Sequence, residues 1–256
     1  MVDAGFSVLS VVAMGYRDFI RVLRTLTNLV LIALAISLGL RFFALLFLAS
    51  WLSIPVVGMF LSLGLSALRS FLLTPFYIAV HRFIILDEVT HTYSFDWRNR
   101  RFMLFFAWSF ALTALVSALG ILLLLLMILL IPWWEAQLLA ALIVIVATAI
   151  VLLRLTIIFP AIAVDAPGAD GPNAFADTKG HASRIFAVFL VAALPFIVAY
   201  FLIKPSGAGL SLSGTLIDAV VSVLFIPLLL SLASRIFQAL ADRLVARTAT
   251  DAAAPI

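Results

Sequence analysis

Four charged residues stand inside long apolar stretches, where a charge is costly and often functional. They are Arg41, Arg69, Arg154 and Asp218. An arginine at the centre of a bilayer costs roughly 2.5–3.5 kcal/mol on insertion scales, so it must pair, face water or extend its side chain to the interface. The positions of Arg41 and Asp218 favour an ion pair between the first and last apolar runs. The alternative is that these residues form a polar cavity for an anionic headgroup or solute.

A second charged group closes one of the apolar runs. It contains His81, Arg82, Asp87 and Glu88, and we expect it to lie at the level of the lipid headgroups. A metal site is not favoured, because none of the three histidines has a metal-ligand spacing such as HExxH and the chain has no cysteine. An enzyme of lipid metabolism would need these histidine and acidic side chains, together with His181, in one pocket.

Motifs of soluble catalytic and cofactor-binding sites are missing from the sequence. It contains no GxSxG, no P-loop and no GxGxxG, and no single apolar run holds a pair of carboxylates. We therefore predict no catalytic site and no cofactor, and interpret the chain as a non-enzymatic protein.

Composition places the chain in the membrane class. Of its 256 residues, 66% are hydrophobic and 11% are charged, whereas soluble domains average about 45–50% apolar and about 25% charged residues. The formal net charge is +4. Because the basic residues flank apolar runs, they are typical of topology signals, and nucleic-acid binding is not predicted.

Six apolar runs are long enough to cross a bilayer: 26–49, 55–80, 102–131, 137–159, 185–203 and 214–234. The predicted fold class is therefore an all-α, polytopic transmembrane helix bundle. Residues 1–25 precede it and carry Arg17, Arg21 and Arg24 on one helical stripe. This pattern predicts an interfacial amphipathic helix, or else a cytoplasmic extension of the first span. The predicted division is 1–25, a transmembrane domain over 26–235, and a cytoplasmic tail over 236–256.

The distribution of basic residues predicts the orientation. With the N-terminus inside, twelve of the sixteen Lys and Arg residues lie on the inner side, Lys204 alone lies outside, and three lie within spans. The inner twelve are Arg17, Arg21, Arg24, Arg82, Arg98, Arg100, Arg101, Lys179, Arg184, Arg235, Arg243 and Arg247. This strong bias predicts that both termini are cytoplasmic.

Two apolar runs share a spacing of arginine and proline. Arg69 precedes Pro75 by six residues, and Arg154 precedes Pro160 by six, 85 residues further on. Each pair is followed by a polar segment, a basic cluster and another span. This pattern indicates a parallel internal repeat, unless two apolar helices are alike by chance.

Three stretches carry a resemblance to a known group of proteins. AVHRFIILDE (79–88), RLTIIFPAIAVD (154–165) and AFADTKGHASRIF (174–186) are similar to bacterial six-helix membrane proteins loosely related to the membrane domain of glycerophosphoryl diester phosphodiesterases. The resemblance covers roughly residues 10–235 and implies an integral membrane protein. No stretch is long or polar enough for the soluble catalytic barrel, so the resemblance implies no catalytic residues here.

Together these features predict a multi-pass protein of the bacterial inner membrane with a structural or lipid-interacting role. Its predicted partners are membrane lipids, and a homo-oligomer or a partner membrane protein is compatible with the pattern. The alternative function is a small transporter or permease subunit for an anionic or lipid-like solute. That alternative requires Arg41, Arg69 and Arg154 to line a common cavity.

Overall fold

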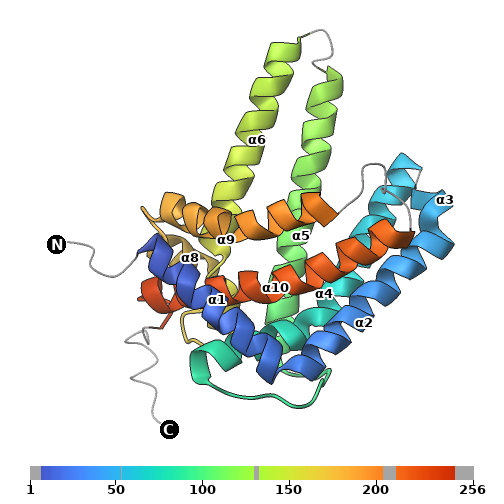
Figure 1. Ribbon diagram of the computed structural model, residues 1–256. Helices are drawn as coiled ribbons and strands as arrows, with labels where there is room; N and C mark the ends of the chain where they lie inside the picture. Colours follow the sequence, from blue (N-terminus) through green and yellow to red (C-terminus); the bar gives the residue numbers. More distant parts are fainter. Residues whose placement is uncertain (1–6, 53, 130–132, 204–211, 246–256) are drawn as a thin grey trace.

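The computed structural model describes residues 7–52, 54–129, 133–203 and 212–245, and over these residues the fold is all-α, without strands (Figure 1). The elements in chain order are α1 (Val8–Thr25), α2 (Thr27–Phe43), the π-helical η1 (Ala44–Leu48), α3 (Ala49–Leu52), α4 (Pro55–Leu86), α5 (Arg100–Leu129), α6 (Trp134–Leu155), α7 (Ile158–Ala163), α8 (Gly171–Asp177), α9 (Ala182–Ile203) and α10 (Leu212–Leu240). Two predicted topology markers, Lys204 and Arg247, lie outside the described residues.

Among the described residues, six helical stretches are long and apolar enough to cross a membrane, so the chain is a multi-pass membrane protein. They are Thr27–Leu48, Val57–Leu86, Arg100–Met127, Trp134–Ala163, Ala182–Ile203 and Leu216–Leu240. They match the six predicted runs in order. Two boundaries were predicted wrongly: the last helix continues past residue 234 to Leu240, and the second helix continues past residue 80 to Leu86, because Phe83 and Ile84 are buried on its core side. Helix α4 ends where Asp87 adopts a positive φ of 57°.

The amphipathic first helix, α1, lies along α10 (Figure 1). Its buried face includes Val11, Gly15 and Val22. A Cβ added at Gly15 would lie 2.5 Å from Leu232 Cδ2, so a residue without a side chain allows the two helices to approach closely. The apolar stripe of α1 is therefore occupied by protein, and its arginine-bearing side is left exposed.

The buried interior has two parts. The larger surrounds the short helix α7, whose Ile158, Ala161 and Ala163 are inaccessible to solvent, and includes residues of α1, α5, α9 and α10. The smaller lies between α2 and α4, with Leu29 and Phe76 at its centre. The polar segments that come after α4 and α7 are therefore attached to well-packed helices.

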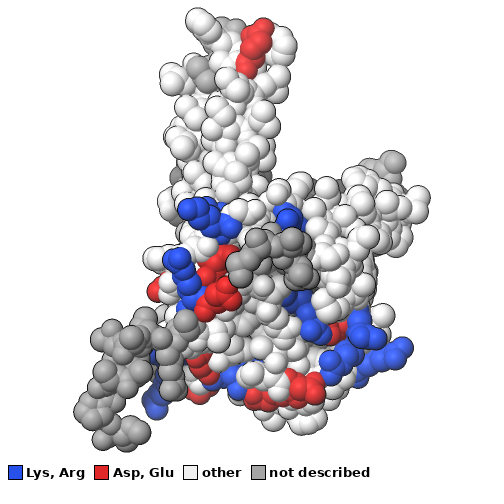
Figure 2. Space-filling view, turned by 90° about the vertical axis from the view of Figure 1, so that its left-hand side faces the viewer, with Lys and Arg blue, Asp and Glu red and all other residues white. Residues whose placement is uncertain are grey.

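The hairpin of α5 and α6 projects away from the rest of the molecule (Figure 1). The shaft of this projection carries no charged side chains on the face shown in Figure 2. Its large apolar side chains, such as Leu125 and Ile143, are more than half exposed. In a membrane protein such a surface is suited to contact with lipid tails.

Segments that the charge pattern predicts on the inner side are linked to one another. Arg21 of α1 donates to Asp87 after α4 at 2.8 Å, and Arg101 at the start of α5 bonds Asp165 after α7. Asp177 at the end of α8 accepts from the backbone N–H groups of residues 243 and 244. The polar connections are thus joined by charged groups, and Figure 2 shows several blue and red patches below the hairpin.

Candidate functional site

A cavity of about 180 Å³ lies between α2 and α4 at membrane depth. Its lining residues are Ser37, Leu40, Arg41, Ala44, Leu65, Ser66 and Arg69. Two of the four predicted intramembrane charges therefore share one cavity. We call it the Arg41–Arg69 cavity.

Arg41 is held on one side of this cavity by the last helix. Its Nη2 donates to Ser222 Oγ at 3.1 Å, and its Nη1 lies 4.0 Å from Asp218 Oδ2. Tyr200 of α9 donates to Asp218 Oδ1 at 2.8 Å, which orients the carboxylate. The structure therefore contains the predicted Arg41–Asp218 ion pair, at the long end of the distance range for such a pair.

Arg69 and Ser37 have hydrogen-bonding capacity that the protein does not use. Ser37 is 1% exposed, and both its Oγ and the Nε of Arg69 are buried without a partner among the described residues. Within the described chain Arg69 makes no ion pair, although it lies twelve residues from the start of its span and seventeen from its end. A buried polar group left unpaired costs about 1–3 kcal/mol. Two guanidinium groups line the cavity, and the Asp218 carboxylate that pairs with Arg41 is not among its lining residues, so the cavity is chemically suited to an anion.

Arg154 lies elsewhere. Its Nη2 donates to the carbonyl oxygen of Phe175 at 2.5 Å, and its guanidinium carbon lies 4.7 Å from the centroid of the Phe175 ring. Thr178 Oγ1 donates to the carbonyl oxygen of Ala174 at 2.7 Å and lies 3.3 Å from that of Arg154. Arg154 therefore fastens α6 to α8 and does not line the Arg41–Arg69 cavity.

The predicted headgroup-level cluster is divided in the structure. Arg82 bonds Glu88, donates to the carbonyl oxygen of Ala163 at 3.0 Å and lies 3.6 Å from Asp165. Asp87 instead pairs with Arg21. The charged members thus serve as links between polar segments.

Histidine 81 does not belong with those charges. Its side chain is fully buried, and Nδ1 lies 2.8 Å from Ser234 Oγ of α10. The position follows from helical geometry, because His81 is adjacent to Arg82 in sequence and therefore points about 100° away around α4. His181 contacts the carbonyl oxygen of Lys179. The described residues hold no group of three or more potential metal ligands, and the histidine and acidic side chains do not form one catalytic pocket.

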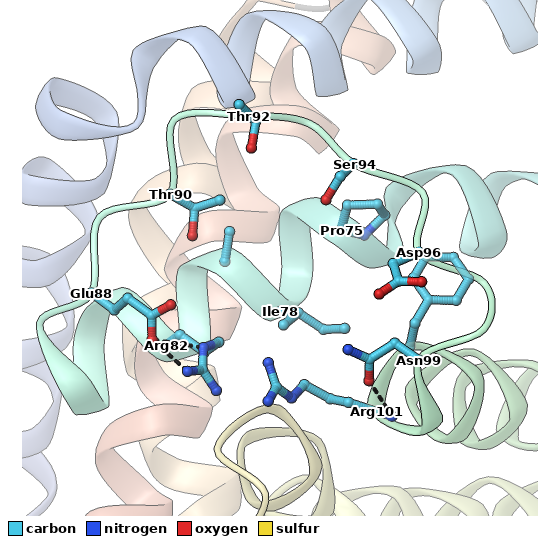
Figure 3. Close-up of a pocket in the computed structure, with 12 residues that line it drawn as sticks. Pro75, Ile78, Arg82, Glu88, Thr90, Thr92, Ser94, Asp96, Asn99 and Arg101 are labelled. Carbon is cyan, nitrogen blue, oxygen red and sulfur yellow. Dashed lines mark hydrogen bonds and ion pairs between the residues drawn. The ribbon is translucent and has the colours of Figure 1, made fainter.

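A second cavity, of about 210 Å³, lies between α4 and the segment immediately after it (Figure 3). Its lining residues are Pro75, Ile78, Ala79, Arg82, Glu88, Thr90, Thr92, Ser94, Asp96, Asn99, Arg101 and Phe102. The segment is fixed to α4 by Tyr93, whose hydroxyl donates to the carbonyl oxygen of Leu72 at 2.6 Å. Burial raises the pKa of Tyr93.

Several important residues were not found by sequence reasoning. Asp18 is 1% exposed and accepts from Arg235 through both oxygens, at 2.5 and 2.9 Å, which ties α1 to α10. The sequence feature that could have identified Asp18 is its position on the apolar face of the first helix. Asp165 joins Arg82 and Arg101. The lining of the second cavity had a sequence signal as well, an alternation of polar and less polar residues over 88–97.

The six spans and the two cavities define an integral, multi-pass membrane protein with polar sites at two depths. Comparisons of the chain with protein-family models, with curated proteins and with solved structures gave no match. Its function must therefore be inferred from the chemistry of its sites.

Proposed function

We propose that this chain is a lipid-interacting, non-enzymatic protein of the bacterial inner membrane, and that it holds the phosphate of an anionic lipid in the Arg41–Arg69 cavity. The observation that carries the proposal is that, in the part of the chain the structure describes, the buried Nε of Arg69 and the Oγ of Ser37 have no partner and both residues line this cavity. A phosphate oxygen supplies the acceptors that both groups lack.

The position of the cavity favours a lipid over a water-soluble anion. Phe43 and Leu68, next to the cavity residues on α2 and α4, are 46% and 45% exposed. In a bilayer these side chains face lipid tails, so an acyl chain can lie along the outside while its phosphate reaches the arginines. The guanidinium group is well suited to this role because its planar N–H donors match phosphate geometry.

The orientation that we propose has both termini in the cytoplasm. It is supported by the bias of twelve inner basic residues against one outer residue. It is also supported by the bonds that join α1, the segment after α4 and the segment after α7. These segments must lie on the same side of the membrane for their charged groups to pair.

The transporter alternative has less support. It requires Arg154 to line the same cavity as Arg41 and Arg69, whereas Arg154 is bonded to Phe175. The relationship to the phosphodiesterase membrane domain stays a prediction from the three sequence stretches.

The test is lipid retention by the purified full-length protein. Native mass spectrometry in phosphatidylglycerol-containing detergent micelles would compare the wild type with Arg69→Gln. Because a charged hydrogen bond contributes about 1.5–3 kcal/mol, we expect roughly tenfold or greater weakening of phosphatidylglycerol binding.

The matched control is Arg98→Gln, which removes the same charge from an exposed loop position where the arginine stacks on Trp97. This variant should retain the lipid as the wild type does. Equal binding by wild type and Arg69→Gln, with both proteins folded, would contradict the proposal.

A further inference from the structure

The segment over residues 88–96, here called the strap, presents every second side chain to the second cavity. Glu88, Thr90, Thr92, Ser94 and Asp96 all line it, and Figure 3 shows the four hydroxyl and acidic side chains from Thr90 to Asp96 along one arch above α4. An extended chain places alternate residues on opposite sides. The strap therefore has one polar side that faces the cavity.

The other side of the strap is anchored to the protein. Besides the Tyr93 hydrogen bond to Leu72, the ring of Phe95 stacks on Phe71 of α4 at 6.2 Å between centroids and 10° between planes. Tyr93 and Phe95 also contact each other, with centroids 5.4 Å apart. The polar row is thus held in place by aromatic packing, which prepares it for a ligand.

The polar row has free hydrogen-bonding groups. In the part of the chain that the structure describes, the side chains of Thr90, Thr92, Ser94 and Asp96 have no intramolecular partner. The two arginines at the cavity are already committed, Arg82 to Glu88 and Arg101 to Asp165. What remains for a ligand is three hydroxyls, one carboxylate and the side-chain N–H donors of Asn99.

The opposite wall is apolar. It is formed by Pro75, Ile78 and Ala79 of α4 and by Phe102 of α5. A flat apolar wall opposite a row of hydroxyls, a carboxylate and an amide matches a ring or short chain that carries hydroxyls on one side and C–H groups on the other. The volume of about 210 Å³ is many times the roughly 10–15 Å³ needed for one water molecule.

We propose that the strap and α4 bind a neutral polyhydroxy group such as a sugar, either free or as the headgroup of a glycolipid. Hydroxyl groups both donate and accept, so they can pair with Thr and Ser hydroxyls and with the Asp96 carboxylate at once. A phosphate is disfavoured here, because the Asp96 carboxylate would repel it and both arginines at the cavity are already paired with carboxylates. The site is separate from the Arg41–Arg69 cavity and does not depend on it.

The experiment is calorimetric titration of the full-length protein in nanodiscs. Calorimetric titration with glucose tests binding of the free sugar. Native mass spectrometry of protein in nanodiscs with or without glucosyl-diacylglycerol tests binding of the lipid-linked sugar. The variant Thr92→Val/Ser94→Ala removes two hydroxyls and keeps the approximate volumes. We expect it to weaken sugar binding at least tenfold, and Asp96→Asn to weaken it by a smaller factor.

The control is His91→Ala, on the alternate side of the strap, which should bind as the wild type does. Thermal unfolding would establish that all variants are folded. Binding of neither sugar source by the wild type would overturn the proposal. Equal affinity in the hydroxyl-deleted variant would overturn it too, as would tighter binding of inorganic phosphate than of either sugar source.

Discussion

The helices that carry Arg69 and Arg154 share a sequence pattern but differ in what the arginine contacts. Each arginine precedes a proline by six residues, and each segment ends in an aspartate with a positive φ, 57° at Asp87 and 55° at Asp165. The Nε of each arginine is buried without a partner among the described residues, but Arg154 donates through Nη2 to Phe175 of α8, whereas Arg69 has no ion pair in the described chain and lies beside a cavity. The same spacing thus places one arginine beside a cavity and the other in a packing contact.

The difference arises from the path of the chain around each proline. Helix α4 continues through Pro75 for eleven more residues, so the chain after Arg69 moves far from it. The second segment is interrupted at residues 156–157, and Pro160 stands in the first turn of the separate helix α7, where a missing N–H is tolerated. The segment after α7 then places α8 against α6, and α8 supplies the carbonyl oxygen that Arg154 needs.

The largest expected effect on the free energy of unfolding is that of substituting Arg154, which is bonded to α8. Arg154→Ala should destabilise the protein by about 2–4 kcal/mol, because it removes a charged hydrogen bond of about 1.5–3 kcal/mol and a cation–π contact of about 0.5–1 kcal/mol. Steric trapping or SDS titration would measure the free energy of unfolding. Arg154→Lys, which keeps the charge, should lie between the wild type and the alanine variant.

Substitution of Arg69 should change the free energy of unfolding in the opposite direction. Without a bound anion, Arg69→Leu should stabilise the protein by about 1–3 kcal/mol, since a buried donor without an acceptor is removed from membrane depth. The same assay on delipidated protein would measure it. If Arg69→Leu and Arg154→Ala destabilised the delipidated protein equally, the two arginines would have the same structural role and the comparison would fail.

The sequence carried enough information for the spans but not for these contacts. Apolar runs of sufficient length predicted all six helices, because lipid demands uninterrupted hydrogen-bonded helix. The pairing of Arg41 with Asp218 was also predictable from depth. The bond from Arg154 to Phe175 was not, since it depends on how the segment after α7 places α8 beside α6, which the apolar pattern of the span does not specify. The burial of Asp18 against Arg235 depends on how α1 lies on α10, which the sequence of either helix alone does not specify.

The smallest effect concerns how the Arg69 helix itself is supported. Arg154 bonds its own helix to α8, whereas within the described residues Arg69 makes no such link for α4. Helix α4 is instead bonded by Tyr93 of the strap, whose hydroxyl donates to the carbonyl oxygen of Leu72, three residues before Pro75. Tyr93→Phe should cost about 0.5–1.5 kcal/mol at neutral pH, the usual net contribution of one hydrogen bond. A larger loss would mean that the strap, and not the proline-containing helix, determines the packing around α4.

Ionisation of the same tyrosine gives an independent measurement. Because burial raises the pKa of Tyr93 above its ordinary value of 10.0, the unfolded chain releases this proton at a lower pH than the folded protein does. The stabilisation is complete below pH 10 and is lost as the pH rises through the folded-state pKa. The unfolding free energy of the wild type should therefore fall more steeply above pH 10 than that of Tyr93→Phe. Parallel pH profiles for the two proteins would show that Tyr93 is accessible to water and does not anchor the strap to the Arg69 helix.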